Sequence, residues 1–342
     1  MSERHHLTKP ALFRTHEDGP PSIRQRLVSI GLGLFAACIA SACGSAQHVA
    51  PAPAMPAPLA TAAPTAVASP PPTEQHRLFL WSIPSSRAIV YLLGSVHAAS
   101  KDVYPLNPKI ESAFDRAETL VLELPMDQAS QQQAALKLAS AGTYPANDSI
   151  DKHVDGEVLA LLQQQLTRSG GSLDAVRSFR PWLVAVMLTL GELQRQGYRA
   201  DLGIDIHFAE KVKDRKRFLA LEAVEEQVAL FAGMTDALQG QLLKETLSML
   251  GALGEDMKRA LLLWRTGDAR AMDELLVAPL RKDYPDLYRR FFVERNRKMA
   301  AAIEGYLDTT GGYFVVVGAG HLVGPEGILE LLRGKGYTPI QE

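Results

Sequence analysis

Two apolar runs that lie far apart in the chain each lead directly into the motif Gly-x-x-His, and this repeated pattern constrains the fold more than any other feature. The runs occupy residues 89–93 and 313–317, and the motifs end at His97 and His321. Uninterrupted apolar runs are typical of parallel strands that are covered on both faces. Ligands of open α/β sheets bind at the carboxyl ends of such strands. We therefore expect the two histidines to approach each other at one end of a sheet; the alternative is that they belong to unrelated surface loops.

The remaining patterns place strands at both ends of one domain and helices in its middle. Predicted strands cover residues 78–83, 88–93, 119–124, 217–221, 313–317 and 337–340, and the first two form a hairpin. Helical spacing runs through residues 107–117, 127–200, 203–213, 224–307 and 325–332, with breaks at Gly233, Gly254 and Gly267. This order predicts an α/β fold: a mixed β-sheet with flanking helices and a helical insert.

Residues 1–43 have the pattern of an export signal. The charge-free apolar run 27–40 is shorter than the roughly 20 residues that span a bilayer, and arginines precede it. It ends in Ala-Ser-Ala-Cys-Gly, which resembles the lipobox of bacterial lipoproteins, so Cys43 is the predicted lipidation site and membrane anchor. The alternative is ordinary cleavage after Ala-x-Ala. Gly44 stands where lipoproteins of the inner membrane usually have Asp. These features predict secretion across the inner membrane, as a periplasmic or outer-membrane-anchored lipoprotein.

Composition divides the rest of the chain. Residues 44–75 are rich in Pro and Ala and cannot bury a core, so they are predicted to be a flexible linker before a domain at 76–342. Both cysteines, Cys38 and Cys43, precede that domain. Any metal ligand in the domain is therefore His, Asp, Glu or another oxygen donor. The formal net charge is −2 and no basic patch is present, which argues against nucleic acid as a partner.

A second matched pair consists of two carboxylates. Glu123 follows the apolar run 119–122, and Glu222 follows 218–221. A covered carboxylate needs a partner, and His with carboxylate suits either a divalent metal or acid–base chemistry. The alternative is an exposed residue at each strand end. For Glu222 in particular, the nearby acidic residues Glu225 and Glu226 indicate a mostly solvated helix start.

Two charged residues share the apolar faces of predicted helices. Arg295 lies on the apolar stripe of its helix, where a buried arginine usually meets a carboxylate or an anion; the alternative is a side chain that reaches solvent from the edge of the stripe. Asp205 shares a face with apolar residues and is a candidate binding residue. Gly94 and Gly318 are binding candidates because glycine lets the backbone approach a ligand closely. Among the other histidines of the domain, His207 is predicted at the surface, and His76 and His153 have no partner pattern.

Five segments together resemble the TraB/GumN family, which includes the Tiki-type metalloproteases. They read LLGSVH, LVLELP, GIDIHFAEKVKDRKRFLALEAVEEQ, VERNRKMA and VVVGAGHLVGPEGILELLRGKGY. The resemblance extends from about residue 78 to the end of the chain. The resemblance implies a fold similar to the haem-binding ChaN and erythromycin esterase group. It also implies that the two Gly-x-x-His motifs and a strand glutamate form a metal centre, which here corresponds to His97, His321 and Glu123.

The predicted function is a metal-dependent hydrolase of the cell envelope, with a peptide or protein as substrate. A divalent ion such as Mn, Co or Zn would be held by His97, His321 and Glu123 and would activate water. Glu123 or Glu222 would act as the base, and Arg295 would stabilise an anion. The sequence has no HExxH motif, so a standard zincin is excluded. The alternatives are an envelope protein that binds haem, metal or peptide without catalysis, and an accessory factor in exopolysaccharide export.

The predicted lipid anchor can be tested with Cys43→Ser. Because a lipoprotein is held at the membrane by the acyl chains on its first cysteine, the variant should appear in the soluble fraction. Fractionation and intact-mass measurement check this. Unchanged membrane retention of the variant, with no acyl mass on the natural chain, would contradict the prediction.

Overall fold

The computed structural model describes residues 77–212 and 216–342. The predicted signal, the linker and Cys43 therefore lie outside the described residues. None of the helices in the described ranges has the length and apolar character required to cross a membrane.

The described strands form one mixed, six-stranded sheet in the order β4-β3-β5-β2-β1-β6. The strands are β1 (Leu80–Pro84), β2 (Ala88–Ser95), β3 (Thr119–Leu122), β4 (Arg217–Ala220), β5 (Gly311–Gly318) and β6 (Ile340–Gln341). The four neighbours β4, β3, β5 and β2 are parallel, whereas β1 and β6 are added antiparallel. The predicted α/β class with a mixed sheet is confirmed.

The two strands that carry the Gly-x-x-His motifs lie side by side, as their matched sequences predicted. β2 and β5 pair in parallel over their full lengths, and Ser95 is opposite Gly318. Both strands are buried almost throughout, which is why they read as apolar runs without alternation. The parallel pairing brings both motifs to the same end of the sheet.

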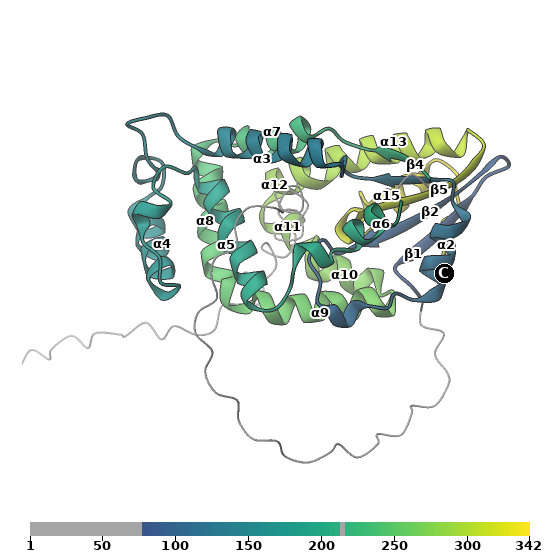
Figure 1. Ribbon diagram of the computed structural model, residues 1–342, viewed down its shortest axis with the longest axis horizontal. Helices are drawn as coiled ribbons and strands as arrows, with labels where there is room; N and C mark the ends of the chain where they lie inside the picture. Colours follow the sequence, from purple (N-terminus) through teal and green to yellow (C-terminus); the bar gives the residue numbers. More distant parts are fainter. Residues whose placement is uncertain (1–76, 213–215) are drawn as a thin grey trace, which may run out of the picture.

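Helices flank the sheet and continue beyond it as the predicted helical insert (Figure 1). They are α2 (Pro108–Arg116), α3 (Gln128–Gly142), α4 (Gly156–Arg168), α5 (Pro181–Arg195), α6 (Ile204–Val212), α7 (Val224–Ala232), α8 (Asp236–Met249), α9 (Leu253–Thr266), α10 (Ala269–Leu276), α11 (Ala278–Asp283), α12 (Pro285–Tyr288), α13 (Glu294–Leu307), α14 (Ala319–Leu322) and α15 (Ile328–Gly334). In Figure 1, α4, α5 and α8 lie at the end of the molecule farthest from the sheet. Two helices pack on the central strand β5, because the Phe314 ring meets Phe114 of α2 at 5.5 Å and Phe208 of α6 at 4.8 Å.

Several element boundaries differ from the sequence predictions. β3 ends at Leu122 instead of residue 124, so Glu123 stands just beyond the strand. The last strand covers only residues 340–341. The last helix begins at Ile328 instead of residue 325, because Gly327 before it has an extended backbone (φ −69°, ψ 154°). The break predicted at Gly254 was wrong: the interruption is the 3-10 turn Leu250–Ala252, and Gly254 lies within α9.

Gly94 is required by packing in the core. A Cβ atom at this position would lie 2.4 Å from Cδ1 of Phe79 and 3.2 Å from Cα of Ala319. Its carbonyl oxygen accepts a hydrogen bond of 2.6 Å from Nε1 of Trp264, which anchors α9 to the end of β2. The absence of a side chain therefore lets Phe79 and Ala319 pack closely against the strand.

Substitution of Gly94 tests this account of the core. Gly94→Ala should lower the free energy of unfolding by about 1–3 kcal/mol, the usual cost of extra atoms in a packed core. Gly305→Ala is the matched control, because its Cβ meets nothing within 4 Å. On an exposed helix it should stabilise the protein by about 0.4–1 kcal/mol. Denaturant unfolding measures both, and equal effects of the two variants would refute the packing account.

Candidate functional site

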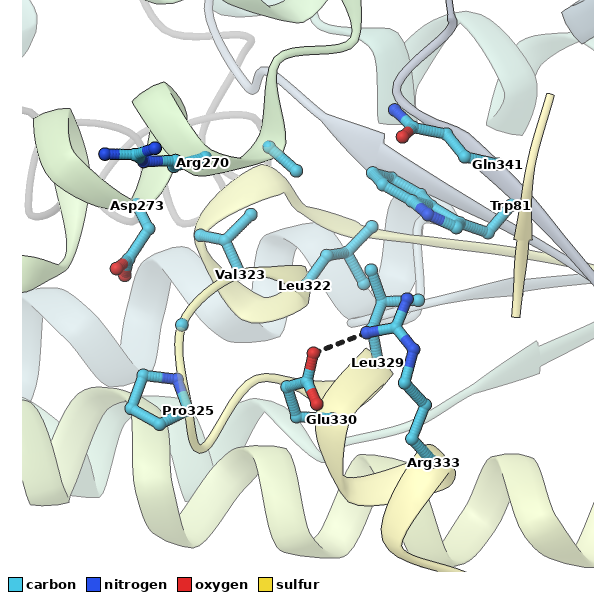
Figure 2. A pocket seen from close by; sticks show the side chains of 12 residues that line it. Trp81, Arg270, Asp273, Leu322, Val323, Pro325, Leu329, Glu330, Arg333 and Gln341 are labelled. Carbon is cyan, nitrogen blue, oxygen red and sulfur yellow. Dashed lines mark hydrogen bonds and ion pairs between the residues drawn. The ribbon is translucent and has the colours of Figure 1, made fainter. Parts of the chain in front are cut away.

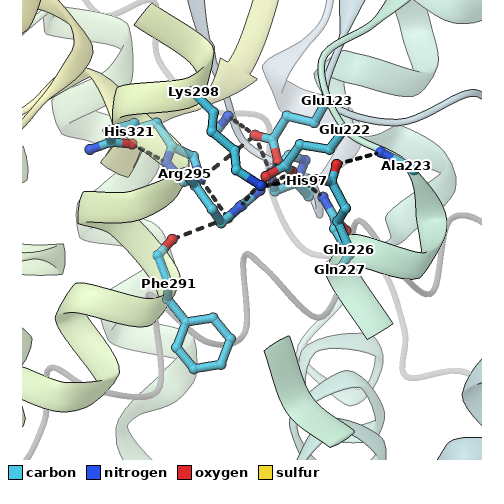
Figure 3. A network of polar contacts seen from close by, with 12 residues as sticks. His97, Glu123, Glu222, Ala223, Glu226, Gln227, Phe291, Arg295, Lys298 and His321 are labelled. Atoms are coloured by element: carbon cyan, nitrogen blue, oxygen red, sulfur yellow. Dashed lines mark hydrogen bonds and ion pairs between the residues drawn. The ribbon is translucent and has the colours of Figure 1, made fainter. Parts of the chain in front are cut away.

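The four predicted histidine and glutamate side chains meet beyond the carboxyl ends of four neighbouring parallel strands (Figure 3). His97 follows β2, Glu123 follows β3, Glu222 follows β4, and His321 lies in α14, directly after β5. All four are buried, with exposed fractions between 3% and 6%. The chain leaves the sheet at the carboxyl end of each of these strands, so the histidine or glutamate that follows each strand lies near the other three.

The Glu123 carboxylate lies between the two histidines. Its Oε1 is 3.9 Å from Nε2 of His97 and 3.9 Å from Nε2 of His321. The same oxygen accepts a hydrogen bond of 2.6 Å from the backbone N–H of Gly318. The expectation that the histidines of the two motifs approach each other is confirmed.

Arg295 closes the site from the start of α13, and every N–H of its guanidinium has an acceptor. Nη2 donates to Glu123 Oε2 and to Glu222 Oε2, and Nε donates to Glu222 Oε1, each at 2.7 Å. Nη1 donates to Nε2 of His321 at 2.9 Å and to the carbonyl oxygen of Phe291 at 3.2 Å. These contacts use all five donors of an arginine. The side chain is 3% exposed, so the alternative of an arginine that reaches solvent was wrong.

Glu222 is buried, contrary to the expectation of a mostly solvated helix start. Besides Arg295, it accepts a hydrogen bond of 2.9 Å from Nε2 of Gln227. The expectation does hold for its neighbours: the half-exposed Glu225 and Glu226 form ion pairs of 2.9 Å with Lys137 and Lys298. The structure thus separates one buried carboxylate from two solvated ones within a single acidic run.

The two motif glycines have different surroundings, although their sequence contexts match. A Cβ atom at Gly318 would lie 3.0 Å from Nε2 of His97 and 3.4 Å from Oε1 of Glu123. Gly318 therefore allows the polar side chains to approach the strand end closely. Gly94 faces Phe79 instead.

His97 faces a second carboxylate. Its Nδ1 lies 3.2 Å from Oδ1 of Asp205, which is buried in the first turn of α6. Burial by itself acts to lower the pKa of His97, but the negative charges of Asp205 and Glu123 outweigh it and raise the pKa above its ordinary value. Asp205 thus lies inside the site, as expected, and favours the protonated form of His97.

His321 has the opposite environment. Its Nδ1 lies 2.6 Å from Oδ1 of the buried side chain of Asn296, and its Nε2 faces Arg295. Burial, and then the positive charge of Arg295, hold the pKa of His321 well below its ordinary value. Sequence reasoning missed Asn296, for which the only signal was its position next to Arg295 in the segment VERNRKMA.

Comparison with known proteins identifies the family of the chain. The model of the TraB/PrgY/gumN family matches residues 79–341. The chain belongs to the TraB/PrgY/gumN family. Similar proteins include "Uncharacterized protein YbaP" of Escherichia coli strain K12, 25% identical over 256 residues that cover 74% of this chain and 90% of the relative. An "Uncharacterized protein" of Treponema pallidum is 24% identical over 279 residues, covering 76% and 81%. No solved structure matches the chain.

A divalent ion does not fit the residues of this TraB/PrgY/gumN site as they are arranged. Nε2 of His321, which would have to bind the ion, accepts a hydrogen bond from Arg295, and both oxygens of Glu123 accept hydrogen bonds as well. A guanidinium at that position repels a second cation. In the part of the chain that the structure describes, no three His, Cys, Asp or Glu side chains are grouped as a metal ion requires. Metal binding stays a prediction.

A cavity beside His97 has room for one water-sized molecule. Its volume is about 10 Å³, and its lining includes His97, Glu123, Asp205 and Met126. Ligand pockets are usually about 300–1,000 Å³, so haem, the alternative cofactor, does not fit here.

Larger pockets lie away from these residues. One of about 520 Å³ is lined by Trp81 and by charged side chains that already have partners, such as Arg333, which pairs with Glu330 (Figure 2). Another, of about 750 Å³, lies beside Arg195, which pairs with Glu192. None of the predicted site residues lines either pocket.

The remaining described histidines lie outside the site but are not isolated. His207 is partly exposed, near the surface as predicted, and pairs with Glu111 at 3.0 Å. His153, which had no partner pattern in the sequence, bridges Asp236 at 2.8 Å and Asp148 at 3.0 Å. Asp236 lies at the start of α8, far along the chain, whereas Asp148 is only five residues before His153.

The influence of Asp205 on His97 can be measured directly. Asp205→Asn should lower the pKa of His97, because it removes the negative charge that opposes the effect of burial. A histidine whose pKa is raised by folding contributes stability fully below its unfolded pKa of about 6.5, and loses it as the pH rises through the folded pKa. The advantage of the natural protein over Asp205→Asn in free energy of unfolding should therefore be largest below about pH 6.5 and shrink at higher pH.

NMR titration of the His97 ring gives the pKa, and unfolding at several pH values gives the stability. Asp201→Asn is the matched control, because Asp201 lies one turn earlier in the chain and pairs with Arg199 in an exposed position. An unchanged pKa in Asp205→Asn would show that the carboxylate does not act on His97.

Proposed function

We propose that this protein is a hydrolase of the bacterial cell envelope in which His97 acts as the general base. One observation carries the proposal: the water-sized cavity is bounded by His97, Asp205 and Glu123, so a water molecule there is within reach of a histidine backed by a carboxylate. This combination of base, orienting carboxylate and space for a nucleophile is what general-base hydrolysis requires.

The roles follow from the charges around His97. His97 takes a proton from water while the oxygen attacks a carbonyl carbon, and the imidazolium that forms is stabilised by Asp205 and by Glu123, 3.9 Å away. Arg295 places a positive charge beside the negative oxygen that develops on the substrate. His97 then returns the proton to the leaving nitrogen as the carbon–nitrogen bond breaks.

The division between the two histidines supports this assignment. One has a raised pKa and a carboxylate partner, whereas the other has a lowered pKa and faces a guanidinium. Titratable groups whose environments drive their pKa values apart are characteristic of acid–base sites. The acid–base role therefore belongs to His97, and His321 is assigned the role of binding rather than of proton transfer.

A peptide or protein in the cell envelope is the substrate we propose. The support is the resemblance to a family that includes peptidases and the lipobox-like sequence at Cys43. One observation favours a non-catalytic binding protein instead: all five N–H groups of Arg295 are engaged within the protein. Assays of the following variants distinguish these two functions.

Glu123→Gln should lower kcat by roughly 100-fold or more, because the imidazolium loses a neighbouring negative charge. Arg295→Lys should also lower kcat, because lysine keeps the charge but lacks the planar fork that holds two carboxylates. Release of fluorescent fragments from a peptide library measures activity, and thermal unfolding reports the fold. Glu225→Gln is the control, since this nearby carboxylate is half exposed.

Full activity of a folded Glu123→Gln variant would remove Glu123 from the mechanism. Absence of cleavage by the natural protein, with saturable peptide binding, would favour the non-catalytic function. Metal analysis of the purified protein, and activity assays before and after chelation, show whether hydrolysis requires a metal ion. Activity that is lost on chelation and restored by Mn, Co or Zn would establish metal dependence and overturn the metal-independent steps given above.

A further inference from the structure

The two Gly-x-x-His motifs end in histidines with different second partners, Asp205 for His97 and Asn296 for His321. We propose that Asn296 is a positioning residue. It fixes the proton of His321 on Nδ1 and thereby makes Nε2 the acceptor that holds Arg295 between the two buried glutamates. The effect on hydrolysis rests on the function proposed above, whereas the position of the proton does not.

The orientation of the Asn296 amide determines which nitrogen of His321 carries the proton. Nδ2 of Asn296 lies 2.8 Å from the backbone carbonyl oxygen of Glu326. A carbonyl oxygen only accepts hydrogen bonds, so the amide group that faces it is the NH2. Oδ1 of Asn296 therefore faces Nδ1 of His321 at 2.6 Å. Because Oδ1 also only accepts, Nδ1 must be the protonated nitrogen.

The other side of the ring requires the same tautomer. Nη1 of Arg295 lies 2.9 Å from Nε2 of His321 and can only donate. The reverse tautomer would place two N–H groups against each other at Arg295 and two acceptors against each other at Asn296. Two independent partners thus agree on one arrangement, in a place where exposed fractions are 1–4% and water cannot substitute for a lost partner.

Asn296 is itself held in place by Glu326, which is in turn held by Tyr288. Glu326, whose carbonyl fixes the amide, accepts a hydrogen bond of 2.6 Å from the hydroxyl of Tyr288 through its side chain. Asn296 and Arg295 are adjacent in the first turn of α13, so the same helix supplies the guanidinium and the amide that orients its acceptor. If Nε2 of His321 no longer accepted this hydrogen bond, one N–H of Nη1 would be unsatisfied, and the guanidinium would be free to rotate away from Glu123.

The first test uses the natural full chain, labelled with ¹⁵N on histidine. Long-range ¹H–¹⁵N correlation spectra distinguish protonated from bare ring nitrogens, and the spectrum of His321→Gln identifies the signals of His321. We expect a protonated Nδ1 and a bare Nε2. A protonated Nε2 with a bare Nδ1 would overturn the proposal whether or not the protein is a hydrolase.

The second test compares two substitutions with a matched control. Asn296→Leu removes the acceptor of the Nδ1 proton, so the spectrum should no longer show His321 with a protonated Nδ1 and a bare Nε2. Its kcat should fall by up to about 100-fold, as expected for a displaced catalytic group, with KM near the natural value. Asn296→Asp keeps an acceptor and should keep Nδ1 protonated. Gln239→Leu removes an equally buried amide that donates to a backbone carbonyl elsewhere, and should change neither readout.

An Asn296→Leu variant with unchanged ring signals and unchanged kcat would contradict the proposal. If that variant does not fold, the spectra of the natural chain and of Asn296→Asp still decide where the proton lies. If the expected ring signals appear but no peptide is cleaved, the hydrolase function fails and the tautomer assignment stands.

Discussion

The buried guanidinium of Arg295, shared between Glu123 and Glu222, is the interaction on which the rest of the site depends. It joins the ends of β3 and β4 to the start of α13, and through His321 it also joins the end of β5. Taking these charges out of water is costly, and removal of one partner from a buried ion pair typically costs about 3–5 kcal/mol. The site therefore requires every one of these donors and acceptors to be present and aligned.

The placement of these charges explains why the pKa values of His97 and His321 are shifted in opposite directions. Within the described site there are three buried carboxylates, of which Glu123 and Glu222 contact the guanidinium and Asp205 contacts His97, so the surroundings favour additional positive charge. His97 lies beside Asp205 and Glu123 and gains proton affinity, whereas His321 lies against Arg295 and loses it. Burial acts to lower the pKa of both rings; at His97 the negative charges of Asp205 and Glu123 outweigh it, whereas at His321 the positive charge of Arg295 adds to it. The site thus has a proton acceptor and a neutral hydrogen-bond acceptor, each 3.9 Å from the same oxygen of Glu123.

Sequence reasoning located most of this site because its residues interrupt regular patterns. A glutamate after an apolar strand and an arginine on an apolar helix stripe are visible without any knowledge of the fold, and the parallel pairing of β2 and β5 followed from two matched runs. The roles of Asn296 and Gly94 were not visible in this way. An amide in a helix and a glycine near the end of a strand do not reveal these roles locally, and their importance comes from Glu326 and Phe79, which tertiary packing brings beside them.

The same reasoning explains why matched motifs do not imply matched chemistry. The period of a strand and a Gly-x-x-His sequence fix where a histidine leaves the sheet, but the partner of its second ring nitrogen comes from another element: α6 for His97 and α13 for His321. A guanidinium and a divalent ion are also competing ways to compensate Glu123, because both supply positive charge and neither tolerates the other at hydrogen-bond distance. Arg295 occupies that position with all five of its donors engaged, so a metal ion could enter only with rotation of the guanidinium, which the contacts of His321 and Phe291 oppose.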